Sequence, residues 1–219
     1  MKLYELIPSL LSGLGVTLTL TCGGAFIAAV LAWIAGLARL SNLRPLRFAA
    51  SVYIEIFRGT SALVQLYWFF YALPFFGIEL SAIATGIIVL GLNIGAYGAE
   101  VVRGSVISID RGQSEAATAL NLSGPQRLWL IIVPQALLRM LPPAGNLLIE
   151  LLKSTALVSL ITLSDLTFRG MLLRAETLRT AEIFGLLLVI YFCIAQALVY
   201  GLHTVERRLA KAWHLERAK

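Results

Sequence analysis

A single uncharged stretch near the N-terminus constrains the fold more than any other feature. Residues 6–38 contain no Asp, Glu, Lys or Arg, and about 20 apolar residues are enough for a helix to cross the hydrocarbon core of a bilayer. The stretch is too long for a cleavable signal peptide, so we expect it to be retained. Of the whole sequence, 58% is hydrophobic and only 14% is charged, which is far more apolar than a soluble domain. We therefore predict an all-α, polytopic membrane protein.

Four further low-charge stretches follow the first, at residues 59–78, 80–99, about 140–164 and 183–205. Together with the first they predict five transmembrane helices. No repeat of fixed period and no Pro- or Ser-rich linker divides the sequence, so we expect one transmembrane domain over residues 1–219. An odd number of spans places the two ends of the chain on opposite sides of the membrane.

The distribution of positive charge orients these spans. Most of the 18 Lys and Arg residues lie in segments 39–47, 103–139 and 207–219, which five spans would place on one side. Cytoplasmic loops carry the excess of Lys and Arg, so we expect the N-terminus outside and the C-terminus in the cytoplasm. The net charge of +6 is explained by this topology. Because the cations are spread over three loops without a basic stripe, we expect no nucleic-acid partner.

No set of residues suggests an enzyme or a metal site. Cys22 and Cys193 lie in apolar stretches, where free thiols pack as small hydrophobic groups. His203 and His214 have no partners at metal-ligand spacing. Since no nucleophile, base and orienting group can be assembled, we expect no catalytic residue, no metal and no cofactor.

One segment, "GQSEAATALNLSGPQRLWLIIVP" at residues 112–134, does not resemble lipid-facing sequence. The residues from Glu115 to Leu120 are good helix formers, and a Glu near the start suits the positive end of the helix dipole. Asn121 is suited to end this helix, because Asn tolerates the left-handed backbone conformation of a helix stop.

A second helix is expected directly after this stop. Ser123 and Gln126 have the spacing of a capping box, and Pro125 fits the first turn of a helix. Pro134 is expected to break the second helix before the next span. The segment therefore predicts two short helices joined by a definite turn. Their secondary structure alone leaves open whether they form an interfacial hairpin without a partner or a docking element.

The same segment resembles the EAA loop of ABC importer permeases, whose pattern is Glu-Ala-Ala, three residues, Gly, nine residues, Ile, one residue, Leu-Pro. The sequence departs from this pattern at Asn121, where the family has Gly, and at Val133, where it has Leu. Asn preserves the left-handed turn, so the first departure leaves the loop intact. The matching positions are Glu115, Ala116, Ala117, Ile131 and Pro134.

The flanking sequence narrows the resemblance to the five-span permeases of the polar amino acid type. Three further segments are similar to that family in the expected order: "FRGTSALVQL" from Phe57, "GAYGAEVVRG" from Gly95 and "RMLPPAGNLLIELLKSTALVSLI" from Arg139. The resemblance therefore covers nearly the whole chain.

The resemblance implies that the loop at about residues 104–135 docks onto a separate ABC ATPase. Glu115, Ala116, Ala117 and Asn121 are then the coupling residues, with the first three expected in the contact. No lysine of the chain lies in a G-x-x-x-x-G-K-[ST] context, so ATP would be bound by the partner. The further implied partners are an extracytoplasmic solute-binding protein and a second permease, identical or homologous, in the bacterial inner membrane.

Three acid–base pairs recur at i, i+3 spacing, where side chains share a helix face. Ions inside a membrane are costly, so each pair is either a functional candidate or a local neutralisation. The pairs are Glu55 with Arg58, Glu100 with Arg103, and Glu150 with Lys153.

The deepest polar residues are the candidates for a substrate path. Glu150 and Lys153 lie farthest from the charged ends of their span. Gln65, Asn93 and Thr155 add uncharged groups that could bind a zwitterionic solute or bond to a neighbouring helix. For Asn93 the helix-packing interpretation is favoured, because Gly91 and Gly95 flank it at the spacing of close helix contacts.

The substrate itself follows only from resemblance. Ser154 stands where the family usually has Asp, and the loss of this anion beside the path argues against a strongly cationic substrate. The segments "FRGTSALVQL" and "LKSTALVSLI" most resemble permeases for ectoine and hydroxyectoine. The alternative function is an ion-coupled secondary transporter or channel, in which Glu150 and Lys153 would carry the coupling.

Overall fold

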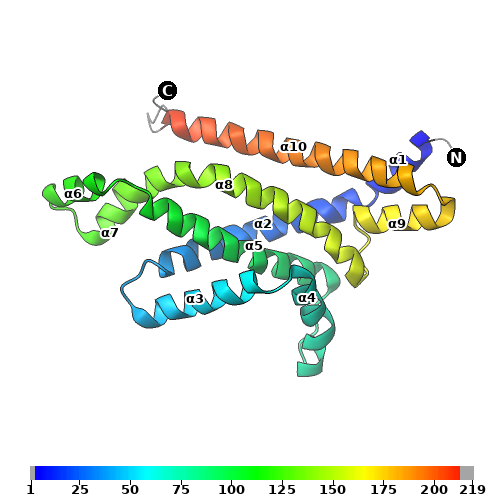
Figure 1. Ribbon diagram of the computed structural model, residues 1–219, viewed down its shortest axis with the longest axis horizontal. Coiled ribbons are helices and arrows are strands. Elements are labelled where there is room, and N and C mark those ends of the chain that lie inside the picture. Colours follow the sequence, from blue (N-terminus) through cyan, green and yellow to red (C-terminus); the bar gives the residue numbers. More distant parts are fainter. Residues whose placement is uncertain (1–2, 213–219) are drawn as a thin grey trace.

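The computed structural model describes residues 3–212, and every regular element within them is helical (Figure 1). This confirms the all-α prediction. The α-helices are α1 (Leu3–Leu11), α2 (Leu14–Ala38), α3 (Arg44–Gly59), α4 (Ala62–Tyr67), α5 (Ala82–Ile107), α6 (Arg111–Ala119), α7 (Gly124–Gln126), α8 (Val133–Ser154), α9 (Leu166–Thr177) and α10 (Thr180–Ala212). Two π-helical segments (Trp68–Ala72 and Arg127–Ile132) and two 3₁₀ segments (Leu73–Phe76 and Thr155–Ile161) continue α4, α7 and α8.

Four helical stretches within residues 3–212 are long and apolar enough to span a membrane. They are Ile7–Ala38, Ala82–Ile107, Gly124–Ile161 and Thr180–Leu209, and they confirm four of the five predicted spans. At the place of the second predicted span, residues 59–78, the structure has a shorter apolar helical stretch, Ala62–Phe76.

The helical path is interrupted at Thr60 and Ser61, where the sequence predicted the start of the second span. α3 ends at Gly59 and α4 begins at Ala62 in a different direction (Figure 1). Thr60 and Ser61 between them have extended backbones, with ψ angles of 154° and 132°. Before this interruption, α3 packs along α2 and α5. Its buried face, Ala50 and Ile54, joins a cluster with small residues of those two helices.

Close contact between α2 and α5 forms the centre of the molecule. A Cβ placed on Gly91 would lie 2.7 Å from the Cβ of Ile27, and one on Gly98 would lie 2.8 Å from the Cβ of Ala32. Gly95 is equally enclosed, with the Cβ of Leu31 at 3.0 Å from its own would-be Cβ. The close-packing role predicted for Gly91 and Gly95 is therefore confirmed.

The two ends of the long axis carry different elements. α1 and α9 lie at the end that contains the start of the described chain, whereas α6 and α7 lie at the end reached by the C-terminal part of α10 (Figure 1). His214 lies outside the described residues.

Asp165 stabilises the N-terminus of α9. Its fully buried carboxylate accepts hydrogen bonds from the backbone N–H groups of Thr167 (3.2 Å) and Phe168 (2.9 Å) and so caps α9. Burial raises the pKa of this carboxyl group, while the capping hydrogen bonds oppose the rise.

The α2–α5 contact gives a direct test of the fold. Gly91→Ala should lower the thermal unfolding temperature of the purified protein in detergent, because overpacking costs about 1–3 kcal/mol. Gly104→Ala, on the same helix with no atom within 4 Å of the added Cβ, should leave stability equal or slightly higher, since Ala is the better helix former. Equal effects of the two substitutions would contradict the assigned contact.

Candidate functional site

The loop between α5 and α8 begins with a longer helix than the sequence suggested. α6 spans Arg111–Ala119, whereas the helix was expected from Glu115. The difference arises from Asp110, whose Oδ1 accepts a hydrogen bond from the N–H of Gly112 at 2.7 Å. An Asp at this position is a strong N-cap, so the signal was present in the sequence.

The predicted turn is confirmed in detail. Asn121 has a φ of 58°, the left-handed conformation expected of a helix stop. The N–H of Leu122 donates to the carbonyl of Ala117 at 3.1 Å, which closes the reverse turn that accompanies such a stop. The side-chain Oε1 of Gln126 then accepts a hydrogen bond from the N–H of Ser123 at 2.9 Å, as a capping box requires.

The expected break at Pro134 is wrong. The chain remains helical from Gly124 to Ile161. The π-helical segment Arg127–Ile132 precedes the proline, and within it the N–H of Val133 donates to the carbonyl of Leu128. This wider turn accommodates a proline that cannot donate a hydrogen bond, and the side chain of Gln135 bonds to the carbonyl of Ile131 at 2.9 Å.

The loop presents a mixed polar and apolar surface. Glu115 and Ala116 are exposed, as are Leu120 (73%) and Trp129 (55%). Ala117, which the resemblance placed in the ATPase contact, is only 2% exposed. Its methyl group is buried, and its carbonyl accepts the hydrogen bond from Leu122 that closes the turn. The exposed surface of the loop is therefore formed by the neighbouring residues.

Side-chain hydrogen bonds attach this loop to the long helices. Arg139 of α8 donates to the carbonyl and hydroxyl of Ser108 at the end of α5. Gln135 of α8 donates to the side-chain oxygen of Gln113 in α6 at 3.2 Å. A displacement of α6 would therefore act on α8 through Gln135, and α8 is joined to the end of α5 through Arg139.

A polar cavity of about 560 Å³ lies between the start of α4, the middle of α5 and α8. Two of the predicted path residues, Asn93 and Glu150, line it. The remaining lining residues are Thr60, Ser61, Ala62, Leu63, Ile94, Tyr97, Leu147, Ser154 and Leu157.

Gln65 and Asn93 support the helix break beside this cavity. The side-chain amide of Asn93 donates to the carbonyl of Phe57 at 2.9 Å and to Oε1 of Gln65 at 3.2 Å. The amide of Gln65 donates to the same carbonyl at 3.0 Å and to Oγ1 of Thr60 at 2.7 Å. Since an unsatisfied carbonyl within apolar surroundings is costly, these two residues make the break possible.

The other predicted path residues are placed differently. Glu150 is exposed at the cavity and forms no ion pair with Lys153 within residues 3–212. Lys153 is exposed but does not line the cavity. Thr155 is fully buried, with its hydroxyl bonded to the carbonyl of Leu152 at 2.7 Å, so it faces the core.

The remaining two acid–base pairs also differ from each other. Glu100 pairs with Arg103 at 2.8 Å, as the spacing predicted. Within the described residues Glu55 forms no ion pair with Arg58, whose guanidinium lies 5.2 Å from the ring centroid of Tyr97, a cation–π contact.

Sequence reasoning missed the cavity residues Thr60, Ser61, Tyr97 and Ser154. The Gly59-Thr60-Ser61 run was interpreted as the start of a span. A Gly followed by two residues of modest helix propensity inside an apolar stretch could have indicated a helix break.

Comparison with known proteins agrees with this geometry. The family of binding-protein-dependent transport system inner membrane components matches residues 28–210. The chain belongs to this family. A probable amino-acid ABC transporter permease, y4tF of Sinorhizobium fredii, is 41% identical over 217 residues, covering 96% of this chain and 91% of that protein. The glutamine permease GlnP of Escherichia coli is 35% identical, covering 94% and 95% of the two chains.

A solved structure resembles the permease closely. A crystal structure of an amino acid ABC transporter with histidines superposes with a TM-score of 0.86 at 34% identity, over 95% of this chain and 99% of the other. The fold is therefore that of an ABC importer permease of type I, and the resemblance drawn from the EAA segment is confirmed at the level of family.

The break between α3 and α4 yields a stability prediction. Asn93→Leu should lower the unfolding free energy of the permease by about 1–3 kcal/mol, because it removes a donor to the Phe57 carbonyl inside the protein. Thermal unfolding followed by tryptophan fluorescence measures the loss. Asn146→Leu, at an exposed position of α8, is the matched control, and an equal loss in both variants would contradict the role of Asn93.

Proposed function

We propose that this permease subunit forms part of the translocation path for a polar amino acid or an amino acid derivative, and that a separate ABC ATPase drives transport. The observation that carries the proposal is the loop at residues 104–135. Its exposed α6 is hydrogen-bonded to α8, α8 is hydrogen-bonded to the end of α5, and α5 and α8 also line the polar cavity.

The proposed ATPase contact uses Glu115, Ala116 and the residues around the turn at Asn121. A short helix seated in a groove of the nucleotide-binding subunit would move when two such subunits close on ATP. The permease itself binds no nucleotide in this proposal, since its lysines lack a P-loop context. An extracytoplasmic solute-binding protein delivers the substrate.

Pairing with a second permease, identical or homologous, follows from the cavity. The cavity is lined by Thr60 and Ser61 at the helix break, by α4, α5 and α8, and by Leu157, and in this proposal a second copy or homologue completes the enclosure of the path. The proposed orientation has the N-terminus outside and the C-terminus in the cytoplasm of the inner membrane. The position of α6 at the same end as the end of α10 supports it (Figure 1).

Glu150 places a negatively charged carboxylate at the polar cavity. Its carboxylate is exposed at the cavity and has no ion-pair partner within residues 3–212, so it can bind the ammonium group of an amino acid or the cationic part of a related zwitterion. Ser154 and Tyr97 add hydroxyl groups to the same cavity. Ectoine and hydroxyectoine belong to the ligands worth testing, together with the polar amino acids.

The proposed coupling role is tested at Glu115. Glu115→Arg should reduce substrate-stimulated ATP hydrolysis and uptake at least about tenfold in proteoliposomes containing the whole complex, because it reverses a charge in the contact. The amount of permease in the membrane should not change. Glu79→Arg, before the start of α5 and therefore remote from the loop, is the control. Unchanged uptake with Glu115→Arg would refute the docking role.

The proposed substrate contact is tested at Glu150. Glu150→Gln should reduce uptake about tenfold or more, since a hydrogen bond to a charged group contributes about 1.5–3 kcal/mol. Lys153→Gln, one turn away and outside the cavity, should have a smaller effect. A larger effect at Lys153 than at Glu150 would show that the cavity is not the path.

The same proteoliposomes separate ATP-driven transport from ion-coupled transport. The complex is purified in mild detergent and supplied with its binding protein and a panel of amino acids and ectoines. We expect one ligand to stimulate ATP hydrolysis and thereby to identify the substrate. Uptake that follows an ion gradient and persists without ATP would instead support a secondary transporter.

A further inference from the structure

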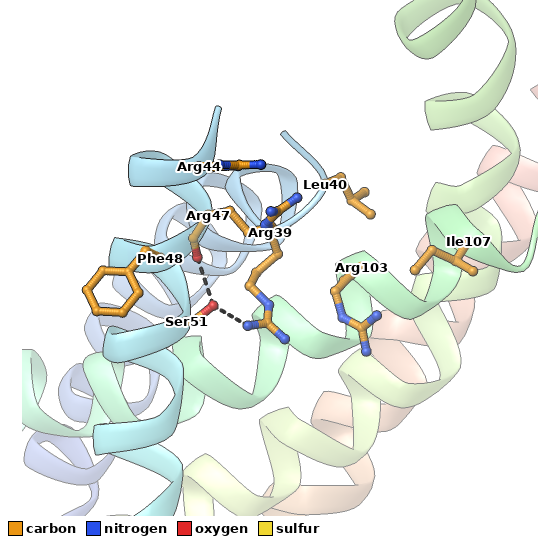
Figure 2. Close-up of a pocket in the computed structure, with 8 residues that line it drawn as sticks. All are labelled: Arg39, Leu40, Arg44, Arg47, Phe48, Ser51, Arg103 and Ile107. Carbon is orange, nitrogen blue, oxygen red and sulfur yellow. Dashed lines mark hydrogen bonds between the residues drawn. The ribbon is translucent and has the colours of Figure 1, made fainter. Parts of the chain in front are cut away.

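A second cavity, distinct from the polar cavity, lies at the end of the molecule that carries the coupling loop. Its volume is about 520 Å³, and it opens between the end of α2, the first half of α3 and the end of α5 (Figure 2). Four arginines from these three helices surround it, and we call it the arginine pocket. Its lining residues are Arg39, Leu40, Arg44, Arg47, Phe48, Ser51, Arg103 and Ile107.

The positive charge of the arginine pocket is only partly balanced. Glu100 pairs with Arg103 at 2.8 Å and with Arg39 at 3.8 Å, so one carboxylate faces two guanidinium groups. Arg44 and Arg47 form no ion pair within residues 3–212, and both are exposed. Four cations and one anion leave a strong preference for a ligand with negative charge.

The geometry of the pocket is held from within the chain. Arg39 donates a hydrogen bond to the hydroxyl of Ser51, which in turn donates to the backbone carbonyl of Arg47 at 2.8 Å (Figure 2). These contacts tie the end of α2 to α3. Arg39 is thereby fixed, and Arg103 is held by its bond to Glu100. The guanidinium groups of Arg44 and Arg47 form no ion pair within residues 3–212 and are available to a ligand.

Exposed apolar side chains border the same pocket. Phe48 is 71% exposed and Ile107 is 59% exposed, although both line it. Leu43, at the start of α3, is 63% exposed. A soluble anion gains nothing from such neighbours, whereas a molecule with an anionic head and an apolar tail could use both.

We propose that the arginine pocket binds the phosphate of an anionic phospholipid. Arg44 and Arg47 would supply the principal hydrogen bonds, since guanidinium groups match phosphate oxygens in pairs. The acyl chains would then lie along Phe48 and Ile107. The pocket lies where the spanning helices α2 and α5 end, which is the depth of lipid headgroups.

Such a lipid would join α2, α3 and α5 next to the coupling loop. α5 leads directly into this loop, and α3 leads to the helix break at the polar cavity. We therefore expect an anionic lipid to strengthen the coupling between ATP hydrolysis and transport. The binding itself depends neither on substrate nor on ATP, so it can be measured independently of the proposed function.

The test counts lipids that remain bound to the purified complex. The whole transporter is placed in nanodiscs of phosphatidylcholine with phosphatidylglycerol, released into mild detergent, and examined by native mass spectrometry. The double variant Arg44→Gln, Arg47→Gln should lower the apparent affinity for phosphatidylglycerol about tenfold or more, as expected for lost charge-assisted hydrogen bonds. The control is Arg207→Gln, Arg208→Gln, which removes two exposed cations from the end of α10.

Each outcome bears directly on the proposal. Retention of phosphatidylglycerol that falls only in the pocket variant supports it. Equal retention in the pocket and control variants overturns it. Displacement of the lipid by millimolar inorganic phosphate alone would assign the pocket to a soluble anion instead. Loss of the ATPase from the complex in the pocket variant, without a change in bound lipid, would make the pocket a protein contact.

Discussion

Every backbone polar group inside an apolar environment needs a partner, and this constraint governs the permease more than any single contact. Regular helices meet it internally, which is why the described chain is built from helices alone. Two departures from regular helix are accommodated locally. Gln65 and Asn93 serve the carbonyl at the break between α3 and α4, and a π-helical turn accommodates Pro134.

These irregular places lie in or beside the two features on which the proposed function rests, the polar cavity and the loop at residues 104–135. The break between α3 and α4 opens one wall of the polar cavity, and α5 and α8 form the others. The same two helices are joined beside the loop at residues 104–135 by the hydrogen bond from Arg139 to Ser108. Because α5 is packed against α2 through glycines without room for side chains, it can act as a stiff element between loop and cavity. A rigid connection of this kind is what a separate ATPase would need to move the path.

How far sequence reasoning reached depends on the range of the interactions involved. The turn at Asn121 and the capping box at Ser123 were predicted correctly, because each is decided by residues within five positions. The glycine contacts of α5 were also predicted, since small residues at four-residue spacing indicate helix contacts directly. The second span was located correctly, but its helix is shorter than predicted, Ala62–Phe76, because apolar composition does not reveal the break after Gly59. The assignments of Ala117 and Thr155 depended on which side of a helix faces the interior, and composition does not fix this.

The sequence by itself determined that the protein crosses the membrane repeatedly, that a helix–turn–helix loop interrupts the spans, and the family to which the chain belongs. These properties follow from hydrophobicity and from local hydrogen bonding. Only the tertiary structure brought Asn93 of α5 to the carbonyl of Phe57 and placed Glu150 at the cavity. It alone gathered Arg39, Arg44, Arg47 and Arg103 around one pocket. Such groups come from different helices, and their meeting is set by how the helices pack rather than by any pattern along the chain.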